Sequence, residues 1–151
     1  MDRINYILSV EKKSKEHHSF VRDHFDFPID LNIDSFLNNG NKYVITARLS
    51  NSNINKIIGL SIFSLFDDRI NVDYVAVDKQ FRKKGINNSI NIMIEDIAKS
   101  NYIDLLSACI RETNTSSIQS FTKSGFDIIG NRKMKYKNGD EKIRFFKKIT
   151  I

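Results

Sequence analysis

The chain has 151 residues, 40% of them hydrophobic and 28% charged, with a formal net charge of +6 at pH 7. This composition excludes a disordered chain, and no apolar run approaches the ~20 residues that span a bilayer, so we expect residues 1–151 to form a single domain with no membrane segment. The only cysteine, Cys109, excludes an internal disulfide and favours a reducing, cytoplasmic setting. No paired Cys/His spacing indicates a metal site.

The first two thirds of the chain predict strands and helices in a mixed order. Apolar residues at helical spacing alternate with runs rich in β-branched and aromatic residues. Pro28 should end the first helix, and Asp34 and Gly40 suit the start and the end of the second. The expected elements are strands over 5–12, 42–49, 56–66 and 69–77 and helices over 15–25, 34–40 and 84–99.

The last third predicts a strand over 103–110, a helix within 114–126 and a hairpin over 132–146. Ser116 and Gln119 have the spacing of a capping box at the start of the helix. Gly125 should end this helix, with Phe126 making the apolar contact that follows a glycine C-cap. Asn138-Gly139 is the preferred pair for a two-residue hairpin turn.

The order of these elements predicts an α/β domain with a mixed sheet. The strand–helix–strand unit over 71–110 should make its two strands parallel.

The net charge lies in the last seventh of the chain. Residues 131–151 contain eight Lys or Arg and two acidic residues, whereas the rest of the chain is balanced. One interpretation is that lysines protect an edge strand from pairing with other chains. The other is an anionic partner, either a phosphorylated substrate or nucleic acid.

The stretch VAVDKQFRKKGINNSI places a basic turn with one glycine between a strand and a helix. The first amides of a helix have no backbone partner, and a tight turn before them lets several N–H groups converge on one anion. Gly85 permits the close approach and unusual backbone dihedrals, and Arg82, Lys83 and Lys84 add positive charge. The chain lacks the P-loop pattern and the G-x-G-x-x-G pattern, so neither a P-loop nucleotidase nor a dinucleotide fold is supported.

Two segments in this order resemble the GNAT superfamily of acyl-CoA N-acyltransferases. RKKGIN at 82–87 is similar to its coenzyme A loop, R/Q-x-x-G-x-G/A. NTSSIQSFTKSGF is similar to its N-x-x-[AS]-x-x-x-[YF]-x-K-x-G-F segment, here with Asn114, Ser117, Phe121, Lys123, Gly125 and Phe126. The resemblance implies a GNAT-like mixed central sheet of about seven strands, splayed between the fourth and fifth and flanked by about four helices. It also implies acetyl-CoA as co-substrate and no metal.

The resemblance also implies where the coenzyme binds. Val75, Ala76 and Val77 would pair with the pantetheine arm as another strand, and one of their N–H groups would polarise the thioester carbonyl. Residues 83–88 would surround the diphosphate, and Asn114 would bind the arm from the other side. The expected coenzyme-binding residues are Val75, Ala76, Val77, Arg82, Lys83, Lys84, Gly85, Ile86, Asn87, Asn88, Asn114, Ser117 and Phe121.

Three residues depart from the family pattern. Asn87 stands where the loop normally has Gly or Ala; Asn tolerates left-handed dihedrals, so the turn should still form, with reduced affinity for the coenzyme. Phe121 stands where many members have a tyrosine that protonates the departing thiolate, and it cannot donate a proton. Cys109 stands where the subgroup that acetylates protein N-termini has a glutamate.

Asp73 is the expected catalytic base that takes a proton from the amine. It lies four residues before Val77, so strand alternation puts both on one face unless a bulge intervenes. Glu112 is an alternative base. Ser117, Ser120 and Tyr136 carry hydroxyls that could serve the leaving group, Cys109 is expected to be a core residue, and the three histidines are expected at the surface.

We therefore expect an N-acetyltransferase that transfers acetyl from acetyl-CoA to a primary amine of a small acceptor by direct attack, as a monomer or homodimer. The basic hairpin favours an anionic acceptor, such as an amino sugar, a nucleotide sugar or another phosphorylated amine. The alternatives are a protein or peptide N-acetyltransferase, a catalytically silent coenzyme-A-binding module and, with less support, a basic nucleic-acid-binding domain.

Overall fold

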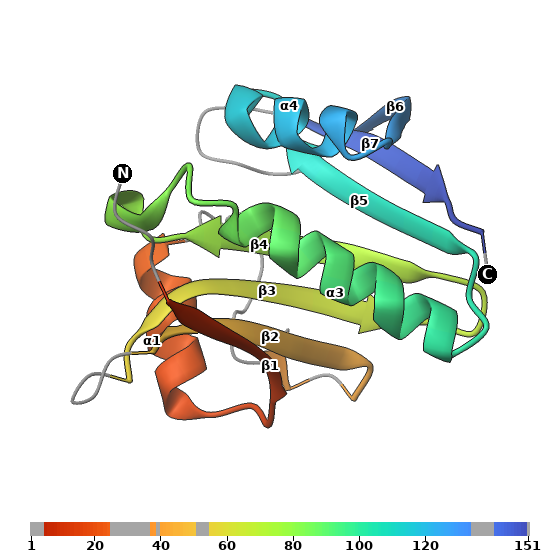
Figure 1. The fold of residues 1–151 in the computed structure, drawn as a ribbon. Helices are drawn as coiled ribbons and strands as arrows, with labels where there is room; N and C mark the ends of the chain where they lie inside the picture. Colours follow the sequence, from red (N-terminus) through yellow and green to blue (C-terminus); the bar gives the residue numbers. More distant parts are fainter. Residues whose placement is uncertain (1–4, 25–36, 39, 51–54, 134–140, 151) are drawn as a thin grey trace.

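A seven-stranded mixed sheet forms the centre of the computed structural model, which describes residues 5–24, 37–38, 40–50, 55–133 and 141–150. The strand order is β1-β2-β3-β4-β5-β7-β6 (Figure 1). Only β4 and β5 are parallel neighbours; the other adjacent pairs are antiparallel. The strands are β1 Tyr6–Glu11, β2 Lys42–Leu49, β3 Ile57–Leu65, β4 Ile70–Val77, β5 Leu105–Arg111, β6 Asp127–Lys133 and β7 Glu141–Lys148.

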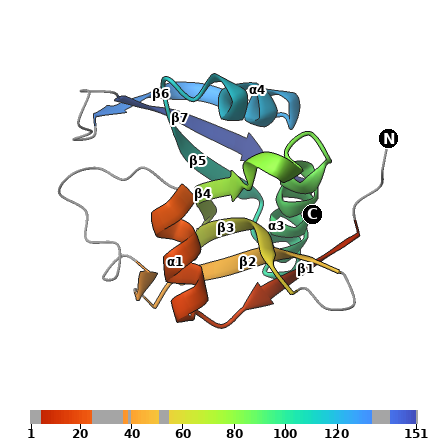
Figure 2. The same cartoon turned by 90° about the vertical axis from the view of Figure 1, so that its left-hand side faces the viewer.

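Helices cover both faces of the sheet. α3 and α4 lie on one face and α1 lies on the other (Figures 1 and 2). The sheet and its parallel pair confirm the predicted mixed α/β fold. About four helices are predicted, and the described residues contain three α-helices, because the expected helix over 34–40 lies largely outside them. The helices are α1 Lys15–His24, α3 Ile86–Ser100, α4 Thr115–Lys123 and the short 3-10 helix η1 Lys79–Phe81.

The helix α3 follows from isoleucines at helical spacing. Ile86, Ile90 and Ile94 are almost fully buried on the face that packs against the sheet. The start of the helix lies close to β3 at Gly59, where an added Cβ would come within 3.1 Å of Ile86 Cγ2. Gly59 therefore sets how closely the first turn of α3 approaches the sheet.

A partly buried ionic cluster attaches α1 to the edge of the sheet. Glu11 accepts hydrogen bonds from Arg48 Nε at 2.6 Å and Thr46 Oγ1 at 2.5 Å, and its other oxygen lies 2.9 Å from His17 Nε2. The Arg48 guanidinium holds the pKa of Glu11 far below its usual value, although burial acts in the opposite direction. His17 is 1% exposed, so the prediction of a surface histidine is wrong there: Glu11 satisfies its ring inside the fold.

Helix α4 begins one residue after Asn114, not at the predicted Ser116–Gln119 box. Asn114 Oδ1 accepts a hydrogen bond from the backbone N–H of Ser117 at 3.2 Å, which makes Asn114 the N-cap. Asn is as good a cap as Ser, and a turn over Glu112 and Thr113, closed by the hydrogen bond from Asn114 N to Arg111 O, leads from β5 to Asn114.

The predicted end of α4 is confirmed. Gly125 has φ +94°, and Phe126 N donates to Phe121 O at 3.0 Å. The rings of Phe121 and Phe126 meet edge to face with centroids 4.9 Å apart, which is the expected apolar contact.

β6 and β7 form the predicted antiparallel hairpin at the end of the chain. β6 is the edge strand, and β7 lies between β6 and β5. The predicted Asn138-Gly139 turn lies outside the described residues.

Candidate functional site

β4 and β5 separate after a short paired stretch. They pair over Ile70–Val72 and Leu106–Ala108. Beyond Val72, no described residue of β4 has a partner on β5, although β4 continues to Val77 and stays paired with β3. The two strands diverge at this point (Figure 1), so the last part of β4 presents a free backbone edge. The predicted splay between the fourth and fifth strands is confirmed.

The turn after β4 ends in a left-handed glycine at the start of α3. Gly85 is the N-cap, with φ 82°, and no side chain among the described residues caps this end of the helix. An added Cβ at Gly85 would meet nothing within 4 Å. The first backbone N–H groups of α3 have no hydrogen-bond acceptor within the helix, so they can converge on an anion above Gly85. The unusual conformation predicted for Gly85 is confirmed.

The basic side chains of the turn are exposed. Arg82, Lys83 and Lys84 all lie at the surface, and Lys83 has φ 61°. Arg82 Nε donates to Val77 O at 3.1 Å, which folds this side chain back over the end of β4. The turn therefore surrounds the start of α3 with positive charge while keeping the helix amides accessible.

Asn87 joins the two motifs that the sequence analysis singled out. It lies in the first turn of α3, so the expectation that its left-handed tolerance is needed is wrong: Lys83 is the left-handed non-glycine residue there. Its Nδ2 donates to Ser120 Oγ on α4 at 3.1 Å. Its Oδ1 is buried without a hydrogen-bond partner among the described residues. The contact brings the start of α3 beside α4.

The other predicted coenzyme-binding residues fall into three environments. Val75 and Val77 pack against the core on the α3 side, and their backbone forms the free edge. Asn114 is exposed, and its cap uses only Oδ1, so its Nδ2 remains a donor. Phe121 is only 3% exposed and packs in the core, which gives its ring a structural role beneath the site. Ile86 is also buried, so only its amide can serve an anion.

A β-bulge at Asp73 overturns the alternation argument for this residue. Tyr74 pairs with Ile62 and Val72 pairs with Phe63, so Asp73 is the extra residue. Its side chain lies on the α1 face of the sheet, whereas Val77 packs on the α3 face. The predicted base therefore does not share a face with Val77. A bulge depends on cross-strand pairing, which sequence alternation does not report.

Both carboxylate oxygens of Asp73 already accept hydrogen bonds. Ser64 Oγ donates at 2.6 Å and Lys42 Nζ at 3.2 Å to Oδ2, and Asn71 Nδ2 donates at 2.7 Å to Oδ1. These three hydrogen bonds also give Asp73 a structural role between β2, β3 and β4. Its role as the base stays a prediction.

The hydrogen bonds of Asp73 continue through Asn71 from β4 to β5. Ser107 Oγ donates to Asn71 Oδ1 at 2.8 Å, and these two residues are register partners. The polar chain thus crosses β2, β3, β4 and β5 and ends where the splay begins. The sequence analysis missed Asn71 and Ser107; polar residues at interior positions of two apolar strands are the signal that could have found them.

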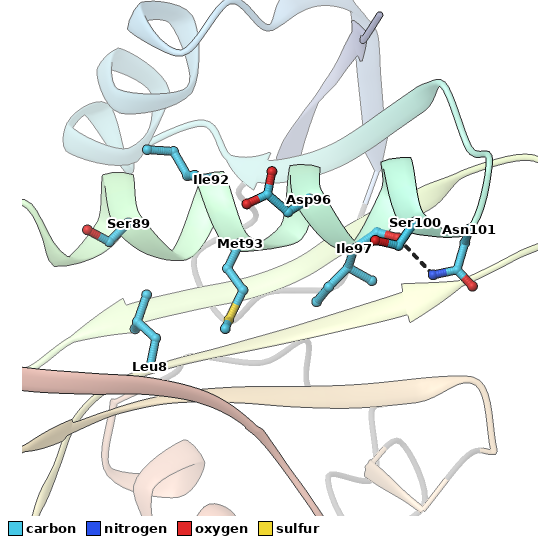
Figure 3. A pocket seen from close by; sticks show the side chains of 8 residues that line it. All are labelled: Leu8, Ser89, Ile92, Met93, Asp96, Ile97, Ser100 and Asn101. Carbon is cyan, nitrogen blue, oxygen red and sulfur yellow. Dashed lines mark hydrogen bonds between the residues drawn. The ribbon is translucent and has the colours of Figure 1, made fainter. Parts of the chain in front are cut away.

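A hollow of about 550 Å³ lies elsewhere, between β1 and α3. Leu8 on β1 faces Met93 and Ile97 on α3 across it (Figure 3). None of the predicted coenzyme-binding residues lines this hollow. It is therefore separate from the gap between β4 and β5.

A family model for the acetyltransferase (GNAT) domain matches residues 68–144, about half of the chain. The chain belongs to the GNAT acetyltransferase family. The match spans the free edge of β4, the Gly85 turn, α4 and most of the final hairpin. Family membership makes this GNAT domain an acetyltransferase and confirms the expected enzyme class, with acetyl-CoA as the co-substrate of the family.

Solved structures share the fold of this GNAT domain at low sequence identity. The IAA acetyltransferase from Bacillus cereus ATCC 14579 is 12% identical with a TM-score of 0.78, covering 96% of this chain and 100% of that chain. The ribosomal-protein-S18-alanine N-acetyltransferase from Escherichia coli is 15% identical with a TM-score of 0.78, covering 97% and 96%. A GNAT family acetyltransferase from Elizabethkingia anophelis, solved with acetyl-CoA bound, is 15% identical with a TM-score of 0.74, covering 96% and 99%. No curated protein matches the chain.

The described part of this GNAT domain has neither a candidate metal site nor a candidate membrane-spanning helix. No group of three or more His, Cys, Asp or Glu side chains there could hold a metal ion. No described helix is long and apolar enough to cross a membrane.

Cys109, expected in the core, is instead partly exposed on β5, opposite Arg144 on β7.

Proposed function

We propose that this GNAT domain is an N-acetyltransferase that binds acetyl-CoA along the free edge of β4. The observation that carries the proposal is that this edge, open beyond Val72, leads directly into the turn capped by Gly85. Backbone groups of Val75–Val77 would pair with the pantetheine arm as with an added strand. The amides of α3 would hold the diphosphate, because the helix N-terminus favours negative charge. Bound acetyl-CoA supplies an activated acetyl group as a thioester.

The residues around the gap fit this coenzyme. Gly85 leaves the helix amides uncovered, and exposed Arg82, Lys83 and Lys84 add positive charge beside them. The Asn87–Ser120 bond places α4 beside the start of α3, so Asn114, at the N-cap of α4, and Ser117, in its first turn, would contact the arm from the side opposite β4.

The acceptor amine would approach from the α1 face of the sheet, and basic residues gather there on β5 and β7. Ile143 and Phe145 pack towards α3 and α4, so alternation puts the even-numbered residues of β7 on the α1 face. The corresponding positions of β5 are odd-numbered. We call Arg111, Lys142, Arg144 and Lys148 the basic face.

The basic face favours a small acceptor that carries a phosphate or carboxylate. The eight positions that β5 and β7 present there contain these four cations and no acidic residue. Charge of one sign beside a reaction site raises the local concentration of oppositely charged ligands. The anionic group would contact the basic face while the amine reaches the free edge of β4.

A protein or peptide amine is the second candidate acceptor. The Escherichia coli neighbour is by name a ribosomal-protein-S18-alanine N-acetyltransferase with the same fold. A peptide would need an extended path across the α1 face. Its charge would also complement the basic face less well than that of a small anion.

The test has two steps. Thermal unfolding and calorimetry with acetyl-CoA come first, and failure to bind overturns the proposal. Free thiol release is then measured with an amino sugar, its phosphate ester, and peptides with free N-termini. We expect the phosphate ester to react about tenfold faster than the uncharged sugar, and Arg144→Gln to reduce this preference. Lys99→Gln, a charge change at the far end of α3, is the matched control. Equal rates for the two sugars would reject the anionic acceptor, and peptide turnover alone would favour the second candidate.

A further inference from the structure

Tyr74 lies next to the point where β4 and β5 separate. It is two residues beyond Val72, the last residue of β4 that pairs with β5, and it is half-buried. Its ring packs with the apolar cluster on the α1 side of the sheet. Among the residues of β4, Tyr74 is therefore the hydroxyl carrier on the face from which the acceptor would approach.

Lys142 reaches this tyrosine from β7. Lys142 Nζ donates a long hydrogen bond of 3.4 Å to Tyr74 OH and lies 4.7 Å from the centre of the ring. Lys142 is 7% exposed, which is rare for a lysine. Because β5 separates β4 from β7 in the sheet, the contact passes over β5. The Tyr74 hydroxyl thus lies over the gap between β4 and β5.

Acetyl transfer to an amine must move one proton. The attacking nitrogen becomes positively charged as it bonds to carbon, and the departing sulfur becomes negative. Three other described side chains near the gap are less suited to carry this proton. Phe121 has no hydroxyl, both oxygens of Asp73 accept hydrogen bonds, and the Ser107 hydroxyl donates to Asn71.

We propose that Tyr74 relays this proton, with Lys142 as the positioning residue. The C–N bond forms and the C–S bond breaks. The phenol oxygen of Tyr74 accepts the proton that leaves the amine nitrogen, and its own hydroxyl proton passes to the departing sulfur. Tyr74 ends the step as it began, and the products are the amide and the free thiol.

The geometry places Lys142 where it would assist the relay. Negative charge that develops on the phenol oxygen during the transfer lies within hydrogen-bond distance of an ammonium group. The low exposure of Lys142 strengthens this interaction, because little water screens it. The long arm of acetyl-CoA, fixed at the α3 end of β4, would extend back along the strand towards Tyr74.

The relay rests on the proposed function, so wild-type protein is first tested for acetyl-CoA binding and turnover. Tyr74→Phe, which removes only the hydroxyl, is then compared with Tyr43→Phe, a tyrosine on β2 that stacks on Phe63. We expect Tyr74→Phe to lower kcat about 100-fold. Its KM for the acceptor, its calorimetric Kd for acetyl-CoA and its melting temperature should stay close to wild type. Tyr43→Phe should retain wild-type kcat.

The outcomes separate the two proposals. Wild-type protein that binds no acetyl-CoA overturns the proposed function. Active wild type with a Tyr74→Phe variant whose kcat is within about twofold overturns the relay alone, as does a variant that loses acetyl-CoA affinity in proportion to its activity. Should Tyr74→Phe not fold, Lys142→Met is tested in its place. A fall of about tenfold in kcat with an unchanged Kd for acetyl-CoA supports the relay, and an unchanged kcat rejects it.

Discussion

Asn87 on α3 donates a hydrogen bond of 3.1 Å to Ser120 on α4, while its own carbonyl oxygen is buried without a partner among the described residues. The two ends of this bond should therefore tolerate truncation differently. Asn87→Ala loses the bond, worth about 1 kcal/mol, but also removes the unsatisfied oxygen. Ser120→Ala leaves the whole Asn87 amide in place without its partner.

We expect Asn87→Ala to change the free energy of unfolding by less than about 1 kcal/mol and Ser120→Ala to lower it by about 1–2 kcal/mol. Urea unfolding of both variants measures the difference. A larger cost for Asn87→Ala than for Ser120→Ala would contradict this account.

Gly85→Ala tests whether the left-handed turn holds the coenzyme. Gly85 has φ 82° and room for a Cβ, so the substitution adds backbone strain without a clash. We expect a loss of about 1 kcal/mol in stability and a fall of about fivefold in affinity for acetyl-CoA, if the turn relaxes to relieve the strain. Gly40→Ala is the control, because Gly40 also has room for a Cβ and no positive φ. Calorimetry with both variants measures the effect, and equal affinities would remove the turn from the binding site.

The Glu11 cluster predicts how stability depends on pH. The pKa of Glu11 is lowered in the folded protein, chiefly by its hydrogen bonds to Arg48. A carboxylate of this kind contributes stability that is fully present above its unfolded pKa of about 4.3 and is lost as the pH falls towards the folded value. Stability should therefore decline below about pH 5.

Glu11→Gln is expected to lower the free energy of unfolding at pH 7 by about 2 kcal/mol and to flatten the decline below pH 5. Urea midpoints of both proteins between pH 3 and pH 7 provide the measurement. Parallel curves for the two proteins would show that another group causes the acid loss.

Asp73→Asn distinguishes a base from a structural anchor. The carboxylate accepts hydrogen bonds from Lys42, Ser64 and Asn71. Removing its charge beside Lys42 should lower the free energy of unfolding by about 3 kcal/mol. A large fall in turnover with unchanged stability and unchanged acetyl-CoA affinity would instead support Asp73 as the base. Turnover, calorimetry and urea unfolding of the same variant decide between the two roles.

Features that depend on local sequence were predictable. The spacing of Ile86, Ile90 and Ile94 predicts α3, and Gly85 and Gly125 mark left-handed positions beside helix ends. Each of these signals lies within a few residues of the feature it predicts. The ordered pair of motifs around Gly85 and Asn114 then identified the family and the splay.

Features that depend on contacts between distant residues were not predictable. His17 is buried because Glu11 and the neighbouring strand β2 surround it, and the helix pattern alone does not report this. The bulge at Asp73 arises from its pairing with β3. The contact between Tyr74 and Lys142 joins residues 68 positions apart. Such arrangements require the assembled sheet.

The parallel pairing of β4 with β5 is short, so the sheet should bend most easily between these two strands. Within the sheet, the described strand pairs that join the β1–β4 half to the β5–β7 half are Ile70–Leu106, Asn71–Ser107 and Val72–Ala108. A molecule that occupies the open edge completes the hydrogen bonding of both halves at once. Binding of acetyl-CoA at this edge would then also stiffen the sheet. Amide exchange in β4 and β5 should therefore slow together when acetyl-CoA is added.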